Sequence, residues 1–514
     1  MSVRHPFPMD LSITASRPPG RSAREHLREQ LRDALLAGQL SAGDPLPATR
    51  VLAAAAGVSR GTVVAVYEDL IGEGYAVAVP GSGTYVSEGL ASPGETEAGD
   101  GRRASARDPA RPASDAAGGG ASGRIGAPNA GAETIDLVPG APAAGLRENR
   151  DWAAAWRRAL RQAPPGDAPP AAGEAELREL LAQHVRSSRG VRCEAADIVV
   201  TAGTSDGIGL LLHGLRGVGG RTRDPDRGAR DANGEPAIRI ATEDPGYPSA
   251  REVIVACGGE AVPVAVRDGG MDPGALRRTR GPLAAALLTP SHQYPLGGRL
   301  PVSARLDLLA WARDADALIF EDDYDSEFRH GAPPLPAIAS LDREERVVLI
   351  GSTSKTLTPW LRCGYLVIAD AALRERVVRA REALGQPVSG YVQAALAEFL
   401  RSGGMRRHLA RMGRVYAHRR RLVIEAAARL GPRFRLGAIE GGLHAAITWE
   451  GAPDPEHSVA RLAERGVALT SLREYSHPGS AERLPNGLVF GYAAPSDLQL
   501  SRALGEIVAT LSGA

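Results

Sequence analysis

The sequence of 514 residues predicts two folded domains of different class. The first is a small winged helix-turn-helix domain, and the second is a large α/β domain with a mostly parallel, doubly wound sheet. Three observations predict this organisation. A stretch from about residue 88 to 133 contains almost no large apolar residues. Before it, two helical patterns flank a glycine turn, and after it, short apolar strands alternate with amphipathic helices.

The composition is that of a folded protein without a disulfide framework. Hydrophobic residues make up 43% of the chain, and the net charge of +1 neither requires nor excludes nucleic acid. The cysteines at positions 193, 257 and 363 are odd in number and scattered, which fits a reducing compartment and offers no metal-ligand spacing. Residues 1–19 lack the apolar core of a signal peptide, and no apolar run approaches a membrane span. We therefore expect a cytoplasmic protein with no membrane partner.

The same composition changes set the expected domain boundaries. Residues 10–87 form the first domain, residues 88–133 form a flexible linker, and residues 134–514 form the second domain. The linker is rich in Gly, Ala, Ser, Pro and Asp, so it cannot bury enough apolar surface to offset the entropy lost on ordering. Residues 219–236 are expected to form a mobile surface insertion in the large domain.

The first domain contains a helix-turn-helix pattern. Thr49 is predicted to cap a short helix that ends near residue 56, Gly57 allows a tight turn, and Ser59 is predicted to cap a second helix. An apolar stripe on this second helix consists of Val63, Val66, Tyr67 and Leu70. Two strands at 75–79 and 84–86 then bracket a turn at 80–83, which predicts a wing.

These residues resemble the winged helix of GntR-type transcription regulators. The resemblance rests on the motifs at residues 46–53 and 57–63 and on the Pro-Gly-Ser-Gly-Thr-Tyr-Val wing at residues 80–86. It implies contacts with double-stranded DNA from Arg50, Ser59, Arg60 and Thr62, with Gly81 at the wing tip. Arginine can read guanine edges or bind phosphate, and a helix N-terminus attracts phosphate. Because Gly61 and Val64 offer no polar side chain, the second helix has few groups that could read bases. The alternative to a DNA-binding domain is a small helical module that only packs against other parts of the protein.

The large domain is predicted from six apolar strands with helices between them. The strands are expected at 197–201, 238–242, 284–289, 317–321, 347–350 and 364–368. A helix at 174–188 is an example of the amphipathic segments that alternate with them. Ligands bind at the carboxyl ends of strands in such sheets, so the residues that follow each strand are the candidate site.

Lys355 is the only lysine in the chain, since every other permanently cationic side chain is arginine. Arginine can replace lysine as a charge, but its guanidinium does not readily condense with an aldehyde, whereas a lysine amine can be tuned to do so. The surviving lysine therefore favours a covalent aldehyde cofactor on Lys355 over a chance surface charge.

A pyridoxal phosphate site also needs a carboxylate for the ring nitrogen and a flat group against the ring. Asp322 follows an apolar strand and is the candidate carboxylate, and Tyr324 is expected to reach the phenolic oxygen of the cofactor. Tyr247 is the expected ring partner, and His292 is a second polar group for the phenolic oxygen. A metal site or a solvated turn is the alternative for the acidic run at residues 321–327, and we favour no metal because the run itself contains no His or Cys and Tyr324 interrupts it.

The phosphate of the cofactor requires a cradle of amides, hydroxyls and a cation. One candidate segment follows a strand and opens a helix, and the other flanks Lys355. The cradle residues are Gly203, Thr204, Ser205, Ser352, Ser354 and Arg362. The Ser352-x-x-Lys355 spacing is also similar to that of penicillin-binding proteins, but those proteins need a second lysine, which this chain lacks.

In series, these motifs resemble the fold-type I aminotransferases, and together with the winged helix they resemble the MocR/GabR subfamily of GntR regulators. The resemblance covers nearly the whole chain outside the linker and the 219–236 insertion. It implies that Lys355 carries pyridoxal phosphate, that Asp322 meets the ring nitrogen, and that Tyr324 meets the phenolic oxygen. It also implies a head-to-tail homodimer.

Three departures from the family pattern concern the phosphate cradle and the substrate site. Asp206 adds an acid near the cradle, residues 163–167 lack the tyrosine that reaches the neighbouring subunit's phosphate, and residues 486–491 lack the arginine that binds a substrate carboxylate. Arg473 is the candidate substitute for effector binding.

We therefore expect a pyridoxal-phosphate-dependent transcription regulator that senses an amine, an amino acid or pyridoxal phosphate itself, with little or no turnover. A working aminotransferase with an accessory winged helix is the alternative from another class. A regulator that has lost the cofactor is a third possibility, but such a chain would have no reason to retain its one lysine.

Overall fold

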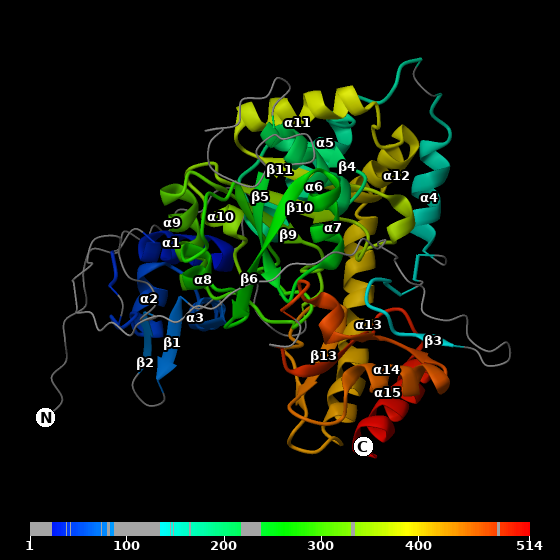
Figure 1. Cartoon of the computed structure of the whole chain (residues 1–514). Helices are drawn as coiled ribbons and strands as arrows, with labels where there is room; N and C mark the ends of the chain where they lie inside the picture. Colours follow the sequence, from blue (N-terminus) through cyan, green and yellow to red (C-terminus); the bar gives the residue numbers. More distant parts are fainter. Residues whose placement is uncertain are drawn as a thin grey trace, which may run out of the picture. The chain divides into compact units, whose positions relative to one another are not determined.

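The computed structural model describes most of the chain after residue 22, in two compact units (Figure 1). The described ranges are 23–36, 39–41, 43–72, 75–79, 83–86, 134–143, 145–146, 149–163, 166–216, 238–329, 335–480 and 484–513. One unit comprises residues 1–71 and 75–133, and the other comprises residues 72–74 and 134–514. The predicted linker at 88–133 and the predicted insertion at 219–236 lie outside the described residues.

The small unit is a winged helix-turn-helix. Its described elements are α1 (Ala23–Leu36), α2 (Thr49–Ala55), α3 (Arg60–Gly72), β1 (Ala76–Val79) and β2 (Gly83–Val86). The predicted stripe on α3 is buried: Val63, Val66 and Leu70 have no exposed surface, and the Tyr67 hydroxyl donates to the carbonyl of Pro47 at 2.6 Å. β1 and β2 pair antiparallel, so the strands of the predicted wing are confirmed.

The predicted cap at Thr49 is wrong, because the helix begins one residue earlier than expected. Ala48 occupies the N-cap position without a side-chain hydrogen bond, and Thr49 is the first helical residue. The Thr49 hydroxyl instead accepts a hydrogen bond from Nε of Arg60 at 3.3 Å. Thr49 therefore links the two helices of the motif.

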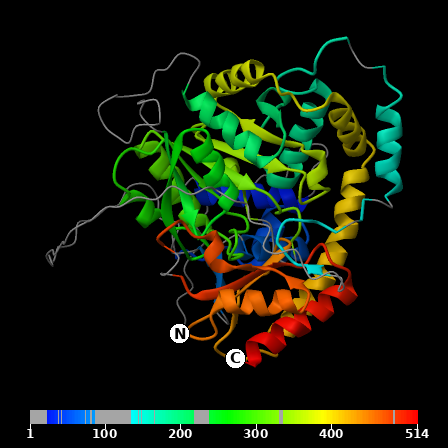
Figure 2. The same cartoon turned by 45° about the vertical axis from the view of Figure 1, so that its right-hand side comes forward.

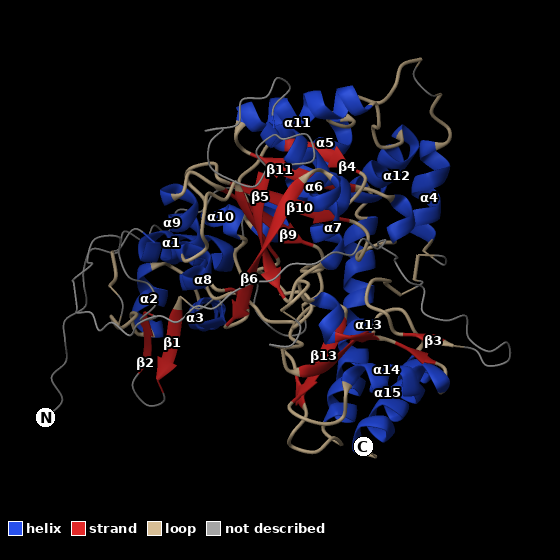
Figure 3. Cartoon of the chain, viewed as in Figure 1, coloured by secondary structure: helices blue, strands red, loops and turns tan. Residues whose placement is uncertain are grey.

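The large unit is built on an eight-stranded sheet (Figure 3). The strand order is β4 (Ile198–Thr201), β11 (Gly364–Ile368), β10 (Val347–Ser352), β9 (Leu318–Asp323), β8 (Ala285–Leu288), β5 (Ile238–Asp244), β6 (Gly259–Arg267) and β7 (Gly270–Met271). The five strands from β10 to β6 are parallel, and all six predicted strands are present with ends shifted by at most two residues. Neighbouring β10 residues Leu349 and Ile350 enter hydrophobic clusters on opposite faces, so the sheet is covered on both sides.

β11 runs antiparallel to both β10 and β4. The link between β10 and β11 holds only a 3₁₀ turn at Pro359–Leu361, whereas a parallel connection needs a crossover that is usually a helix. The chain therefore turns back beside β10. This turn carries Lys355, between the end of β10 and the start of β11.

Helices cover both faces of the sheet. They are α5 (Ala175–Arg189), α6 (Thr204–Arg216), α7 (Pro248–Ala256), α8 (Pro273–Arg277), α9 (Val302–Asp314), α10 (Ile338–Leu341), α11 (Ala371–Leu384) and α12 (Gly390–Arg401), with α4 (Arg150–Ala159) packed on α12. The helix predicted at 174–188 is α5, and Glu174 is its N-cap residue.

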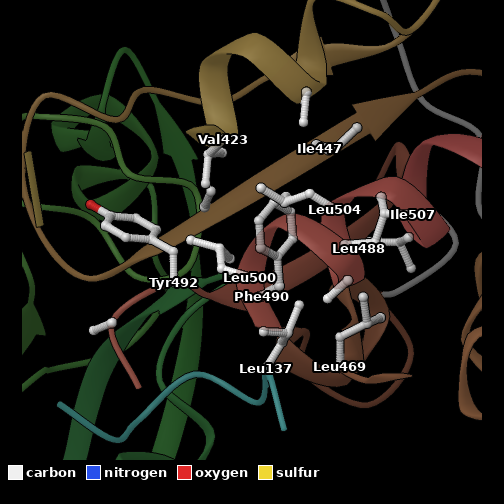
Figure 4. Close-up of a cluster of buried hydrophobic side chains, with 14 of the residues drawn as sticks. Leu137, Val423, Ile447, Leu469, Leu488, Phe490, Tyr492, Leu500, Leu504 and Ile507 are labelled. Carbon is white, nitrogen blue, oxygen red and sulfur yellow. The ribbon is translucent and has the colours of Figure 1, made fainter. Parts of the chain in front are cut away.

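The long helix α13 (Gly404–Ala427) leads from this layer to a C-terminal region (Figures 1 and 2). That region has a four-stranded sheet of β12 (Arg435–Leu436), β13 (His444–Trp449), β16 (Asn486–Gly491) and β15 (Thr470–Ser471), covered by α14 (Pro455–Glu464) and α15 (Asp497–Ser512). Its core holds Phe490, Leu488 and Leu504 (Figure 4). The short strand β3 (Ile135–Asp136) pairs with β14 (Val467–Ala468) and brings the start of the unit back to this region.

Among the described residues, no single helix is long and apolar enough to cross a membrane. α2 and the first part of α3 reach that length only together, and they are bent by 116°. The described cysteines Cys193, Cys257 and Cys363 are all free, as the sequence predicts.

Candidate functional site

The candidate DNA-contacting residues lie at the turn of the small unit. The Ser59 hydroxyl accepts from the amide of Thr62 at 3.1 Å, so the predicted cap on α3 is confirmed. The hydroxyls of Ser59 and Thr62 are also 2.9 Å apart. Arg50 and Arg60 are exposed on consecutive helices. Gly81 lies outside the described residues.

Lys355 lies in the turn that follows β10, and its amine contacts a backbone carbonyl that is distant in the sequence. Its amine donates to the carbonyl of Gly140 at 2.8 Å, across a separation of 215 residues. Burial lowers the pKa of the Lys355 amine, and the charges of Asp325 and Asp322 oppose that shift. A lowered pKa increases the share of neutral amine, which is the form that attacks an aldehyde.

Asp322 lies at the end of β9, beside Lys355, and is nearly fully buried. Its Oδ1 atom has no hydrogen-bond partner among the described residues. Burial raises the pKa of Asp322 to about 8, and the neighbouring carboxylates of Asp323 and Asp325 add to the shift while Lys355 opposes it. A buried carboxyl oxygen without a partner is costly and needs an explanation. A protonated ring nitrogen would supply the missing donor, so the residues present fit the cofactor.

The side chain of the next residue, Asp323, points to the opposite face of the sheet, and both of its carboxylate oxygens have partners. Its carboxylate forms a buried ion pair with Arg189 and accepts a hydrogen bond from Ser326. Adjacent strand residues point to opposite faces, which separates these two acids. Asp322 is therefore the acid available to a ligand.

Tyr324 and His292 lie next to each other, and the hydrogen-bond partner of the Tyr324 hydroxyl is His292. The Tyr324 hydroxyl donates to the backbone carbonyl of His292 at 2.8 Å and lies 3.0 Å from its Nδ1. The Nδ1 atom is also 3.0 Å from Oδ2 of Asp325. Burial and the Asp325 charge raise the pKa of Tyr324 well above its usual value, so the hydroxyl stays protonated.

Aromatic rings line the space around these groups. Tyr294 makes edge contacts with Tyr247, Tyr324 and Tyr475, at centroid distances of 5.3 to 5.8 Å. The ring of His444 is tilted against that of His292 and meets Tyr294 edge-on, and its Nε2 lies 3.1 Å from the carbonyl of Pro295. Burial raises the pKa of Tyr247, with Asp322 adding to the shift and Ser249, Ser205 and Arg362 opposing it. Tyr247 therefore lies close to both the carboxylate and the predicted cradle.

Two of the predicted cradle residues, Gly203 and Arg362, come together where α6 begins. Gly203 has a φ of +102°, and a Cβ there would lie 3.8 Å from Nη1 of Arg362, so the missing side chain leaves the backbone open toward the guanidinium. Thr204 and Ser205 form the first turn of α6, whose free amides favour an anion. Ser352 donates to Ser354 at 3.0 Å in the turn that carries Lys355.

Asp206 does not disturb the cradle, because it has its own partners. Its carboxylate accepts from the amide of Ala202 at 2.7 Å and forms an ion pair with the buried Arg381. The departure from the family pattern is thus neutralised within the unit.

Arg473 is engaged with the acids of its own region. Its guanidinium pairs with Asp454 at 3.1 Å and with Glu456 at 2.5 Å, and it donates to Asn486 at 2.9 Å. These contacts leave little capacity for an effector carboxylate. The structure therefore gives no support to the predicted effector role of Arg473.

Sequence reasoning missed several residues of the site. Gly140, Tyr294 and His444 were not singled out, and Asp325 was noted only as part of an acidic run. Asp325, His292 and His444 have metal-ligand atoms within 4.8 Å of one another, although His292 Nδ1 and His444 Nε2 already have hydrogen-bond partners. The sequence signal for Asp325 was its place two residues after the strand acids; Gly140 and His444 carry no such signal.

Comparisons with known proteins agree with both units. The family described as "Bacterial regulatory proteins, gntR family" matches residues 23–86, and "Aminotransferase class I and II" matches residues 142–504. The HTH-type pyridoxine biosynthesis transcriptional regulator PdxR of Corynebacterium glutamicum is 37% identical, covering 97% of this chain and 98% of its own. The probable rhizopine catabolism regulatory protein MocR of Rhizobium meliloti is 30% identical, covering 91% and 89%.

Among solved structures, the large unit is similar to aminotransferases. The α-aminoadipate aminotransferase LysN of Thermus thermophilus, described in complex with N-(5'-phosphopyridoxyl)-L-leucine, gives a TM-score of 0.63 at 25% identity. The match covers 74% of this chain and 92% of that one.

Proposed function

Because the chain belongs to the MocR-type GntR regulators, and is a transcription regulator with an aminotransferase-like domain, we propose that ligand binding at Lys355 sets its affinity for an operator. The two functions are assigned to the two units. The small unit binds DNA, and the large unit binds the ligand that regulates it.

Pyridoxal phosphate is the proposed ligand of the large unit, since the aminotransferase class I and II fold implies dependence on it in general. When bound, this group supplies an aldehyde that condenses with amines. The unpartnered Oδ1 of Asp322 is the observation that carries the proposal. Asp322 holds a proton at the ring nitrogen, Lys355 supplies the amine, and Gly140 orients that amine through its carbonyl.

The remaining cofactor contacts follow from the same pocket. Tyr247 covers the ring, and Tyr324 with His292 holds the phenolic oxygen. Gly203, Thr204, Ser205 and Arg362 receive the phosphate, with Ser352 and Ser354 beside them.

DNA binding is assigned to the exposed residues of α2 and α3. Arg50 and Arg60 are exposed, and Ser59 with Thr62 offers hydroxyls at the start of α3. We assign Gly81 to the wing tip by resemblance. A homodimer of head-to-tail arrangement in the cytoplasm would present two such units to two half-sites.

The large unit is proposed to sense rather than to turn over its ligand. No arginine stands at residues 486–491, and Arg473 is already paired with two acids, so a substrate carboxylate lacks its usual partner. The signal is an amine or amino acid that displaces Lys355, or pyridoxal phosphate itself. Either ligand shifts the DNA-binding population only through different affinities for two arrangements of the protein.

The test has two parts. The DNA retained by the full-length protein is sequenced with and without pyridoxal phosphate, which yields the operator. Operator affinity is then measured across amines, amino acids and pyridoxal phosphate, alongside a coupled transamination assay. Rapid amino transfer with an unchanged operator affinity would support the aminotransferase alternative instead.

A further inference from the structure

The backbone turn that leads into α6 is fixed by one acidic side chain. Asp206 lies in the first turn of α6, and its Oδ2 accepts a hydrogen bond from the amide of Ala202 at 2.7 Å. This bond spans Gly203, whose φ is +102° and whose missing side chain leaves the backbone open toward Arg362. The same carboxylate therefore holds the turn that the proposed function assigns to the cofactor phosphate.

A carboxylate at this place opposes the role proposed for the turn. The free amides at the start of a helix favour an anion, whereas a negative side chain in the same helical turn repels one. The Asp206 side chain is only 22% exposed, so water screens its charge incompletely. A phosphate is therefore favoured at this turn only where the charge of Asp206 is balanced.

Arg381, on α11, supplies the balancing charge. Its side chain is 1% exposed, and both terminal nitrogens donate to Asp206: Nη1 lies 3.2 Å from Oδ1, and Nη2 forms the shorter bond with Oδ2. Nη1 also donates to the carbonyl of Gln386 at 2.5 Å, just after the end of α11. A two-pronged arginine–carboxylate pair fixes the orientation of the carboxylate as well as its charge.

This pair leaves a different arginine for the ligand. A Cβ on Gly203 would lie 3.8 Å from Nη1 of Arg362, and the Arg362 side chain is exposed. Within the part of the chain that the structure describes, the Arg362 guanidinium has no hydrogen bond or ion pair. The two arginines thus have separate tasks, since Arg381 neutralises the acid and Arg362 is available to a phosphate.

We propose that Arg381 is a positioning residue of the phosphate cradle. By pairing with Asp206, it fixes the turn at Gly203 and makes the site select a phosphorylated aldehyde over the same aldehyde without phosphate. Arg381 is buried, so it acts through Asp206 rather than by contact with the ligand. This role rests on the proposed function, and it belongs to a helix that carries none of the cofactor contacts assigned above.

The test compares pyridoxal phosphate with pyridoxal, which has the same aldehyde and ring but no phosphate. The affinity of the full-length protein for each is measured from the visible band and from borohydride trapping followed by intact mass, with Lys355→Arg as the blank. Arg381→Gln should weaken the binding of pyridoxal phosphate by about tenfold or more, because the unbalanced Asp206 repels the phosphate. The affinity for pyridoxal should be unchanged.

Two further variants and a control separate this charge effect from a folding defect. Arg381→Gln combined with Asp206→Asn removes both charges, keeps an oxygen for the amide of Ala202, and should restore the affinity for pyridoxal phosphate. Asp206→Asn alone should bind pyridoxal phosphate at least as tightly as the wild type, which keeps the role testable if Arg381→Gln does not fold. Arg379→Gln, at an exposed position on the same helix, should change neither affinity.

The outcomes distinguish this role from the proposed function. Equal weakening of both aldehydes by Arg381→Gln would indicate a structural role and overturn the proposal, as would no weakening of either. Weaker binding of pyridoxal phosphate by Asp206→Asn would overturn it as well. A wild type that forms no adduct with pyridoxal phosphate would overturn the proposed function, and the role of Arg381 with it.

Discussion

The two units use their polar residues in opposite ways. In the small unit, the side chains that hold the fold and those offered to DNA are different sets: Val63 and Val66 are fully buried, while Arg50 and Arg60 are exposed. In the large unit, the functional groups Lys355 and Asp322 are held inside, with shifted pKa values and an unpartnered oxygen. A surface function costs the fold little, whereas a buried one destabilises the protein until its ligand arrives.

This difference suits a regulator. A ligand that binds only the folded form at one hundred times its Kd stabilises that form by about 2.7 kcal/mol. Under the proposed function, the unpartnered Oδ1 of Asp322 makes the stability of the large unit depend on its ligand. The predictions below test this contrast, beginning with the largest effect.

Lys355→Arg should abolish the covalent cofactor adduct completely. The guanidinium keeps the charge but cannot condense with the aldehyde, and no other lysine is present. The measurement is the visible absorption band with excess pyridoxal phosphate, together with borohydride trapping. A band that persists in the variant would show that Lys355 is not the attachment site.

Leu70→Ala should unfold the small unit and leave the cofactor site intact. Leu70 is fully buried, and such a truncation costs about 2–5 kcal/mol. Operator binding should be lost while the visible band remains, as followed by circular dichroism and absorbance. Leu498→Ala, at a position 82% exposed on α15, is the matched control. Loss of the band in Leu70→Ala would contradict the separation of the two units.

Arg60→Ala should weaken operator binding without changing stability. A guanidinium contact to a base is worth about 1–3 kcal/mol, so the affinity should fall about tenfold or more. Among the described residues, the exposed Arg60 side chain makes one long hydrogen bond, to Thr49, so the unfolding temperature should stay the same. Equal operator affinity of variant and wild type would remove Arg60 from the recognition surface.

Asp322→Asn should remove a pH dependence from the cofactor-free protein. The pKa of Asp322 is raised in the folded state to about 8, so the folded form binds a proton that the unfolded form has released. Stability is therefore fully present at low pH and falls between about pH 4 and pH 8. Urea unfolding across this range should show a shallower slope for the variant. An identical slope would mean that Asp322 is ionised or compensated in the folded state.

Sequence reasoning succeeded where the signal is local. The six strands predicted from apolar runs are all present, although β6 and β7 of the same sheet were not predicted, and the turn chemistry predicted the Ser59 cap and Gly57. It failed at Thr49, because helix starts shift easily by one residue and the Arg60 contact depends on the second helix.

The site was predictable only in part. Asp322 lies at the end of β9 and Lys355 follows the neighbouring strand β10, and the pairing of these two strands brings them together. Gly140 reaches Lys355 only because β3 pairs with β14 near the other end of the chain, which no local pattern encodes. Likewise, the guanidinium of Arg473 forms ion pairs with two acids of its own C-terminal region, and no local sequence pattern predicted these pairs.

The most direct test of the central claim is operator affinity with and without pyridoxal phosphate, for the wild type and Lys355→Arg side by side. The account predicts that the cofactor changes the affinity of the wild type, in either direction, and leaves that of Lys355→Arg unchanged. An affinity that responds equally in both proteins, or in neither across the effector panel, would contradict it.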